Sequence, residues 1–502
     1  MYKFNKLFFL QVLSALLFTS CQSTDNDEPL PTEPEPEVLE IMVNPDIVLN
    51  DVSSRPFGIN TNTLTDGQNN LAPGARPLSD ALEEIGVKYL RFPGGEKSDV
   101  YMWASPPFVS PTTASLSRIS PVDFPAGFSE FWSLSQNTWT NDNYNFDEFM
   151  TDCQSVGGEP VIVVALDGIY KPAFSGGTSL TREVALEMAT KWVEYANITK
   201  GYNVKYWSLG NETWNNDSYA GANPGFVNYG EDVALFAQAM KAVDPSIKIG
   251  INGNSYTHFT EALSQCAQWV DFLDIHVYPC FGFNSYSDYE NEDLDINGII
   301  TAAKTASNAF PAENGGERFL AMTETSAYGF QEGEWDEGAN LGQSLANFEL
   351  LATLATDSRV QFTQFWNTRW INNNLETPQP TDVFTKENEL NANGKALALL
   401  HNNLHEKMVK STKTNKIKSF ASLDSNTGEL TIFLLNKSQE SQSIKVLLEN
   451  YAISGDIQQS SFSGSSTQDI APTINDLPNL NAVNNEIELT LNSTSITLLK
   501  LF

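Results

Sequence analysis

Basic residues, cysteine and histidine are all scarce in this chain of 502 residues. It has 29 Lys and Arg against 62 Asp and Glu, a formal net charge of −33. Such a surface repels a phosphate backbone, so nucleic acid is excluded as a partner, and long-range attraction of a polyanionic substrate is not expected. The four cysteines and four histidines form no Cys-x-x-Cys or His-x-x-His pair. The sequence therefore predicts no catalytic metal.

Three cysteines lie in the body of the chain: Cys153, Cys266 and Cys280. An odd number without metal-like spacing is typical of thiols that fill a core. A disulfide between Cys266 and Cys280 is the alternative in an exported protein.

A long hydrophobic run is missing, but a short one lies at the N-terminus. Lys3 and Lys6 precede an apolar core over Leu7–Phe18, which is too short to span a membrane comfortably. The segment closes with Leu17-Phe-Thr-Ser-Cys21, which resembles a bacterial lipobox. This predicts a lipoprotein signal peptide over 1–20 and a lipidated Cys21. The alternative is ordinary cleavage that leaves Cys21 as a free thiol.

The next segment is acidic and rich in proline. Residues 21–37 contain the run Glu33-Pro-Glu-Pro-Glu37, and this composition predicts an extended, disordered tether. An acidic stretch directly after the lipidated cysteine resembles the surface-export signal of lipoproteins in Bacteroidetes. The expected location is the outer membrane, with the leaflet left open.

The middle of the chain alternates strand and helix patterns, which is typical of α/β folds. Strands are expected at 56–60, 89–93, 160–166, 206–212, 247–253, 271–278, 319–324 and 360–367. Helices are expected at 78–85, 146–156, 180–198, 233–243, 260–269, 298–309, 344–355 and 394–409. The eight pairs predict a (β/α)8 TIM barrel over 51–410.

Beyond residue 410 the pattern changes to short alternating runs separated by polar turns. Leu430-Thr-Ile-Phe-Leu-Leu-Asn436 is one of these runs. They predict an antiparallel β-sandwich over 411–502. Residues 38–50 are also strand-like, and we expect them to pair with the sandwich.

Tyr206-Trp-Ser-Leu-Gly-Asn-Glu212 is an apolar strand that ends in an amide and a carboxylate. Barrel enzymes carry their chemistry at this end of the strands. Glu212 is therefore a candidate to protonate a glycosidic oxygen, while Asn211 holds a sugar hydroxyl. The alternative is a Glu that simply leaves the strand into solvent.

Phe319-Leu-Ala-Met-Thr-Glu324 repeats this pattern of an apolar strand followed by a glutamate. Two strand-end glutamates in one barrel are what a retaining glycoside hydrolase needs. The prediction is a double displacement in which Glu324 is the nucleophile and Glu212 the acid/base, without a cofactor. Glu212 must then begin protonated and Glu324 ionised.

These residues resemble clan A retaining glycosidases. Leu90-Arg-Phe-Pro-Gly-Gly-Glu-Lys-Ser-Asp99, Trp207-Ser-Leu-Gly-Asn-Glu212 and Thr323-Glu-Thr-Ser-Ala-Tyr-Gly329 are most similar to motifs of the heparanase and bacterial β-glucuronidase family. Arabinofuranosidase and β-xylosidase relatives share the Arg-x-Pro-Gly-Gly and Asn-Glu features. The resemblance implies a carbohydrate substrate from plant or algal cell walls, with β-glucuronidase-, xylosidase- or agarase-like specificity.

The chain also departs from that family. The family reads a uronate through a Gly-x-Tyr segment beyond strand eight, and this chain has Phe365-Trp-Asn-Thr-Arg-Trp370 there. It has Asn60 where the family has Asp at the first strand's tip. Arg369 or Lys97 remains available to pair with a carboxylate or sulfate. A neutral or modified sugar is the other interpretation.

Several further side chains are candidates for substrate binding. Arg91 either keeps the nucleophile ionised or pairs structurally with an acid. His276 and Tyr278 share one side of their strand and are either site residues or core. Trp366 is either a platform for the sugar or part of the barrel core. The substrate-binding candidates are Asn211, Arg91, Asn60, His276, Tyr278, Trp366, Tyr328 and Lys97.

Two further interpretations complete the sequence analysis. The aromatic residues of the segment 99–145, among them Trp103, Phe131, Trp132 and Trp139, predict a loop that shapes the cleft. The alternative function is a non-catalytic glycan-binding surface lipoprotein that has kept the barrel and lost the chemistry.

Overall fold

The structure is a computed structural model. It describes residues 38–52, 56–117, 130–133, 135–166, 169–170, 180–214, 225–312, 317–327, 338–370, 379–453 and 455–502. The predicted signal peptide, Cys21 and the predicted tether lie outside the described residues, as does Tyr328. In the part of the chain that is described, no helix is long and apolar enough to cross a bilayer.

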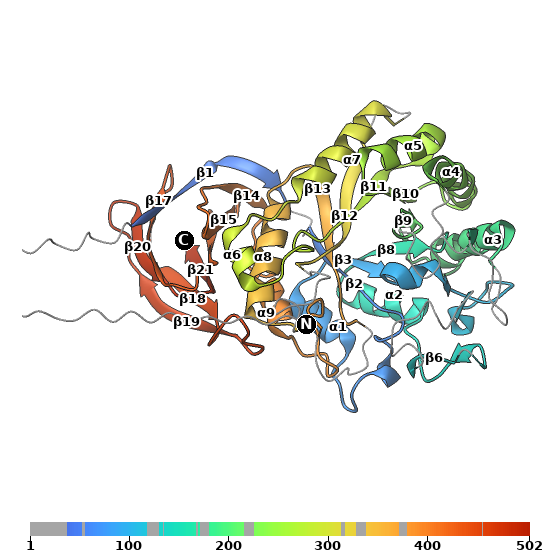
Figure 1. Ribbon diagram of the computed structural model, residues 1–502, viewed down its shortest axis with the longest axis horizontal. Coiled ribbons are helices and arrows are strands. Elements are labelled where there is room, and N and C mark those ends of the chain that lie inside the picture. The colour runs from blue at the N-terminus through green and yellow to red at the C-terminus, as the bar shows by residue number, and fades with distance from the viewer. Residues whose placement is uncertain are drawn as a thin grey trace, which may run out of the picture. The chain divides into compact units, whose positions relative to one another are not determined.

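Eight parallel strands close into a barrel, as the sequence predicts, with helices outside them (Figure 1). In sequence order the strands are β2 (Phe57–Asn60), β3 (Tyr89–Phe92), β8 (Glu159–Val164), β9 (Tyr206–Leu209), β10 (Lys248–Asn252), β11 (Phe272–Val277), β12 (Phe319–Thr325) and β13 (Val360–Phe365). Around the barrel the order is β10-β11-β12-β13-β2-β3-β8-β9. The two predicted glutamates therefore follow β9 and lie on β12, with two strands between them on the shorter path.

Aromatic side chains fill the barrel near the amino ends of its strands. Tyr89 stacks on Phe362 with ring centroids 4.1 Å apart, and Phe272 stacks on Phe319 at 5.2 Å. Tyr206 packs edge-on against the same group. This layer plugs the barrel, so polar side chains gather at the carboxyl ends of the strands.

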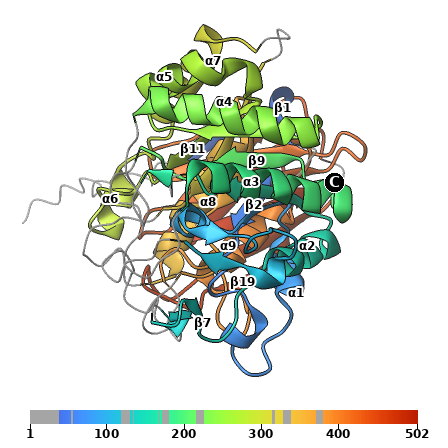
Figure 2. The same cartoon turned by 90° about the vertical axis from the view of Figure 1, so that its right-hand side faces the viewer.

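The described helices form where apolar residues recur at helical spacing and a polar residue caps the start. Asn145 and Glu148 form a capping box at the start of α2, and Ser255 caps α5. Figure 2 shows α3 and α4 in front of β9. The helices are α1 (Leu78–Ile85), α2 (Phe146–Ser155), α3 (Arg182–Val193), α4 (Phe226–Val243), α5 (Tyr256–Cys266), α6 (Tyr286–Asn291), α7 (Asn297–Ala309), α8 (Leu341–Ala355) and α9 (Ala392–His401).

The C-terminal strands and β1 form one nine-stranded sheet, in the order β19-β18-β21-β16-β15-β14-β1-β17-β20. Apolar residues from both halves of this sheet share one core, including Ile41, Ile432 and Ile487. The sheet thus encloses its core as a sandwich does. Its strands are β1 (Leu39–Asp51), β14 (Lys407–Ser411), β15 (Ile417–Leu423), β16 (Leu430–Asn436), β17 (Gln442–Leu448), β18 (Ile457–Ser463), β19 (Thr473–Leu480), β20 (Glu486–Leu491) and β21 (Ser495–Leu501).

Strand β1 lies inside this sheet, where its blue ribbon runs among the red C-terminal strands (Figure 1). It pairs antiparallel with β14 and parallel with β17, so the sheet is not wholly antiparallel. Tyr286 of α6 donates a hydrogen bond to the backbone oxygen of Lys437 at 2.7 Å, which ties the barrel to the sheet.

The boundary predicted at residue 410 is wrong. Helix α9 ends at His401, and residues 407–411 form strand β14 of the sheet. Asn402 and Asn403 follow the helix, and Met408 and Val409, which the predicted helix would have included, are buried in the sheet. The sheet therefore begins before residue 410, because these two apolar residues pair with β1 and β15.

Cys153, Cys266 and Cys280 are buried, and none of them forms a disulfide with another described cysteine. Burial raises the pKa of the Cys153 and Cys266 thiols to about 12, so both stay protonated at neutral pH. Cys266 and Cys280 do not form the alternative disulfide.

Candidate active site

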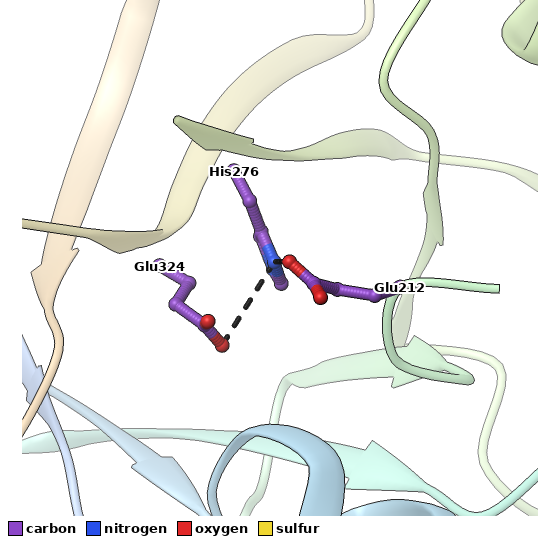
Figure 3. Close-up of side chains that lie close together, drawn as sticks. All are labelled: Glu212, His276 and Glu324. Carbon is purple, nitrogen blue, oxygen red and sulfur yellow. Dashed lines mark hydrogen bonds and ion pairs between the residues drawn. The ribbon is translucent and has the colours of Figure 1, made fainter. Parts of the chain in front are cut away.

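The side chains of Glu212 and Glu324 approach each other at the carboxyl ends of the barrel strands. One oxygen of each carboxylate and one nitrogen of His276 lie within 4.8 Å of one another (Figure 3). The backbone turns sharply before the first glutamate, with φ of 77° at Gly210 and 44° at Glu212. A non-glycine residue in this left-handed region is strained, and such strain is typical of functional sites.

Glu324 is held by two donors. Arg91 Nη1 lies 3.0 Å from Oε2, and the Tyr278 hydroxyl donates to Oε1 at 2.5 Å. Burial, together with the charges of Glu324 and Glu212, raises the pKa of Tyr278 well above its usual value. The phenol therefore remains a donor, and the two contacts together orient the carboxylate.

Two asparagine side chains hold the guanidinium group of Arg91 in place. It is fully buried, and it donates to Asn60 Oδ1 at 2.9 Å and to Asn211 Oδ1 at 2.7 Å. Asn60 is also fully buried and donates to the backbone oxygen of Thr323 at 2.9 Å. Arg91 and Asn60 were predicted to bind substrate directly. Neither side chain reaches the surface, so they support Glu324 from inside the barrel instead.

His276 links the two carboxylates to a buried acid. Its Nδ1 lies 2.9 Å from Glu212 Oε1, and its Nε2 lies 3.0 Å from Thr323 Oγ1 and 3.4 Å from Asp274 Oδ1. Burial alone would lower the pKa of His276, but the charge of Glu324 and hydrogen bonds to Asp274 and Glu212 raise it to about 10. The ring is an imidazolium at neutral pH, so it donates to Glu212 and orients that carboxyl.

Glu212, His276 and Glu324 also have the spacing of a metal site. The same side chains already bond to protein partners: His276 Nδ1 lies 2.9 Å from Glu212 Oε1, and Arg91 and Tyr278 donate to Glu324.

A pocket of about 490 Å³ opens beside the two carboxylates. This volume is suited to a small ligand. Its described lining residues are Glu96, Glu212, Tyr278, Phe281, Glu324, Trp366, Trp370, Gln379, Pro380 and Thr381. Of the predicted residues, both glutamates, Tyr278 and Trp366 therefore reach the pocket surface.

The cations predicted to read an acidic sugar lie elsewhere. Arg369 forms a buried ion pair with Asp66 and donates to the Thr385 backbone oxygen at 3.0 Å. Lys97 is 1% exposed and lies under two tryptophan rings. Among the described lining residues there are three carboxylates and no Lys or Arg. The prediction that Arg369 or Lys97 pairs with a sugar carboxylate or sulfate is wrong for the described pocket.

The described aromatic residues of the segment before α2 do not line this pocket. Trp103, Phe131 and Trp132 are buried, and Trp103 stacks on Trp192 of α3 at 5.9 Å. These rings extend the barrel core because their apolar area is large.

Sequence reasoning missed several site residues. Asp274 precedes His276 by two positions and so faces the same way, a period-two signal that was readable. Phe281 and the wall of residues 379–381 belong to irregular segments after β11 and β13, where no periodic signal exists.

With the geometry in view, the chain can be compared with known proteins. A family model described as "Alpha-L-arabinofuranosidase 1 domain" matches residues 81–293, which include Glu212 but end before Glu324. The chain is similar to a probable α-L-arabinofuranosidase C of Aspergillus fumigatus, with 28% identity over 236 residues, 41% of this chain and 40% of that protein. An intracellular exo-α-(1→5)-L-arabinofuranosidase of Streptomyces lividans is 25% identical over 45% of this chain and 31% of its own length. The matches thus span two fifths or less of these relatives.

Solved structures share the fold over nearly the whole chain. An α-L-arabinofuranosidase from Thermotoga maritima superposes with a TM-score of 0.69 at 18% identity, covering 92% of this chain and 100% of that one. A Paenibacillus polymyxa xyloglucanase gives a TM-score of 0.63 at 13% identity, covering 93% and 99%. The chain therefore shares the barrel-and-sandwich fold of these solved structures.

Proposed function

We propose that the protein is a retaining glycoside hydrolase that cleaves α-L-arabinofuranosides of plant cell-wall polysaccharides. The observation that carries the proposal is the pair of carboxylates on β12 and after β9, with oxygens within 4.8 Å of each other. Retaining enzymes hold their carboxyl groups about 5–5.5 Å apart, whereas inverting enzymes leave room for a water at about 6.5–9.5 Å.

The mechanism has two displacements. Glu324 attacks the anomeric carbon as the bond to the leaving oxygen breaks, and Glu212 gives that oxygen its proton. Glu212, now ionised, takes a proton from water, and the water oxygen attacks the same carbon. The ester to Glu324 breaks, and the sugar leaves with its original configuration.

The surrounding residues fit these roles. Arg91 and Tyr278 contact the two oxygens of Glu324 and aim its carboxylate, which the first displacement needs. His276 holds one oxygen of Glu212 by a hydrogen bond and so orients this carboxyl group for proton transfer. The complete pair and its support disfavour the alternative of a glycan-binding protein without activity.

The choice of sugar rests on two separate supports. The relatives reported above are named for arabinofuranosidase activity. In addition, the described pocket surface carries Glu96, Glu212 and Glu324 without a Lys or Arg, which favours a neutral sugar over a uronate. A β-glucuronidase-like specificity, expected from the strand-end motifs, has no cation here to support it.

A panel of aryl glycosides tests the proposal. Purified protein would be incubated with 4-nitrophenyl α-L-arabinofuranoside, β-D-xylopyranoside, β-D-galactopyranoside and β-D-glucuronide, with the Glu324→Gln variant as the blank. The arabinofuranoside should be hydrolysed fastest, with retained configuration by NMR. Preferred hydrolysis of the glucuronide would refute the choice of sugar, and inversion would refute the mechanism.

We also propose that the enzyme is anchored to the outer membrane through a lipid on Cys21. The proposal is supported by the apolar segment, the lipobox-like ending and the acidic tether in the sequence. An anchored glycosidase of this kind would act on polysaccharide or oligosaccharide near the cell envelope.

A further inference from the structure

Two tryptophans of the pocket wall share one buried cation. Lys97 Nζ lies 4.5 Å from the ring centroid of Trp366 and 4.0 Å from that of Trp370. The lysine is 1% exposed, and among the described residues its Nζ has no hydrogen-bond partner. Indole faces therefore stand where water would otherwise solvate the ammonium group.

The backbone is shaped to allow this contact. Lys97 lies on a short 3₁₀ helix, Gly95–Asp99, which follows β3 after a turn with φ of 101° at Gly94 and 32° at Gly95. A Cβ added at Gly95 would lie 2.1 Å from the Trp366 ring. Only glycine lets this ring come so close. The sequence Gly94-Gly95-Glu96-Lys97 therefore determines the positions of both the Trp366 ring and the Lys97 ammonium group.

A cation over an indole face is attracted by the negative face of the ring, most strongly where water is excluded. The two rings are 5.5 Å apart and inclined by 57°, so one ammonium can hold both. Both rings also line the pocket beside Glu324. A change in the charge of Lys97 therefore affects the two rings at the pocket surface where the sugar is proposed to bind.

The charges around Lys97 are mixed. Glu96, Glu324 and Asp66 attract the ammonium, and Arg91 repels it. Burial nevertheless lowers the pKa of Lys97 to about 7. Its charge is present below neutral pH and is lost as the pH rises through that value.

We propose that Lys97 is a positioning residue that determines specificity: its ammonium fixes Trp366 and Trp370 as one platform for the sugar without touching the sugar itself. The proposal rests on the proposed glycosidase function for its substrate, but the cation and the rings can be tested without it. The platform is firm while Lys97 is charged, and it loosens when the charge is lost.

Two variants separate the charge from the bulk of the side chain. Lys97→Met keeps the length and removes the charge, while Lys97→Arg keeps a cation. With 4-nitrophenyl α-L-arabinofuranoside at about pH 6, Lys97→Met should raise KM about tenfold with kcat changed by less than about threefold. The difference should shrink as the pH rises through about 7, because the wild type then loses its own charge. Lys97→Arg should retain a low KM on both sides of this pH.

Two results would overturn the proposal. One is a KM within about twofold of wild type for Lys97→Met at low pH. The other is a loss confined to kcat, which would place the charge of Lys97 in the chemistry at Glu324 instead of in the platform.

Tryptophan emission tests the same contact without any substrate. This test therefore remains valid even if the proposed function is wrong. An indole's emission responds to a nearby charge, and the wild-type spectrum should shift with a midpoint near pH 7. The shift should be absent in Lys97→Met and in Lys97→Arg, which is always charged. If Lys97→Met does not fold, Lys97→Gln replaces it. An equal shift in wild type and variants, or none in wild type, would refute the cation–indole contact.

Discussion

Arg91 and Glu324 meet inside the barrel from strands β3 and β12, with Nη1 of the arginine 3.0 Å from Oε2 of the glutamate. The two residues are 233 positions apart in the sequence. Their contact is buried, since the two side chains are 0% and 8% exposed. A buried charge pair of this kind is costly to break from one side, because the remaining charge is left without its partner.

Replacement of the Arg91 guanidinium group tests whether the Arg91–Glu324 ion pair serves catalysis. Arg91→Lys keeps the charge but cannot reach Glu324, Asn60 and Asn211 together, so we expect kcat to fall about 10²–10³-fold with a smaller change in KM. Arg359→Lys is the control, because Arg359 pairs with Asp357 away from the described pocket. Steady-state kinetics and thermal unfolding are measured on both. If Arg91→Lys unfolds earlier but keeps wild-type kcat, Arg91 is only structural.

The histidine bridge predicts a pH-dependent stability. The pKa of His276 is raised from 6.5 to about 10, so the folded state binds the proton more tightly than the unfolded chain. The stability gained is complete below pH 6.5 and lost as the pH rises to about 10. The free energy of unfolding of wild type minus that of His276→Gln should therefore decrease over this range, as measured by denaturant titration.

His258 supplies a control of opposite sign. It stacks on Phe226 at 3.8 Å, and burial lowers its pKa. The corresponding difference for His258→Gln should increase as the pH rises toward 6.5. If both differences changed in the same direction, the charge assigned to His276 would be wrong.

The carboxylate of Asp382 holds two residues of the pocket wall through hydrogen bonds. Its carboxylate accepts hydrogen bonds from the backbone nitrogens of Trp370 at 2.6 Å and Gln379 at 2.8 Å, and both residues line the pocket. Asp382→Asn leaves one of these part-buried donors without an acceptor, which costs about 1 kcal/mol. We expect KM to rise about five- to tenfold with little change in kcat.

A matched control exists in the C-terminal sheet domain. Asp469 accepts hydrogen bonds from the backbone nitrogens of Ser465 at 2.7 Å and Ala471 at 2.9 Å. This is the same pattern of two backbone donors to one carboxylate, away from the described pocket. Asp469→Asn should leave KM unchanged. Equal effects of the two substitutions on KM would show that Asp382 has no special link to the pocket.

The proposed location of the protein depends on Cys21. If Cys21 carries lipid as proposed, that lipid should hold the protein in the membrane fraction. Cys21→Ser should therefore release it in soluble form, as measured by cell fractionation, whereas Cys153→Ser should not. Retention of the Cys21→Ser protein in the membrane would refute the anchor.

Much of the barrel was predictable because its strands are short, apolar and buried on both faces. Glu212 follows β9 (Tyr206–Leu209), and Glu324 is the penultimate residue of β12 (Phe319–Thr325), so both carboxylates lie at the strand ends that the pattern predicted. The end of α9 was misjudged, because the apolar residues that continue the pattern beyond His401 belong to β14. Periodicity alone does not tell a helix end from the start of a short strand.

The supporting contacts of the site were less accessible to sequence reasoning. Asn60 and Lys97 were identified as candidates by position, but Lys97 is covered by Trp366 and Trp370, and Asn60 bonds to the backbone of β12 and β13. The wall at Gln379 belongs to an irregular segment, and only tertiary contacts define it. Residue type therefore indicated the chemistry, and packing decided which side chains face the sugar.

The roles of the two glutamates are tested most directly by chemical rescue. Glu324→Ala and Glu212→Ala would be assayed with a dinitrophenyl glycoside of the preferred sugar in the presence of azide, and the glycosyl azides identified by NMR. Glu324→Ala should give the inverted azide, because azide replaces the nucleophile. Glu212→Ala should give the retained azide, because the glycosyl-enzyme still forms with a leaving group that needs no proton. Exchange of the two configurations would mean that the roles are reversed, and a loss of activity below about tenfold in both variants would mean that the site lies elsewhere.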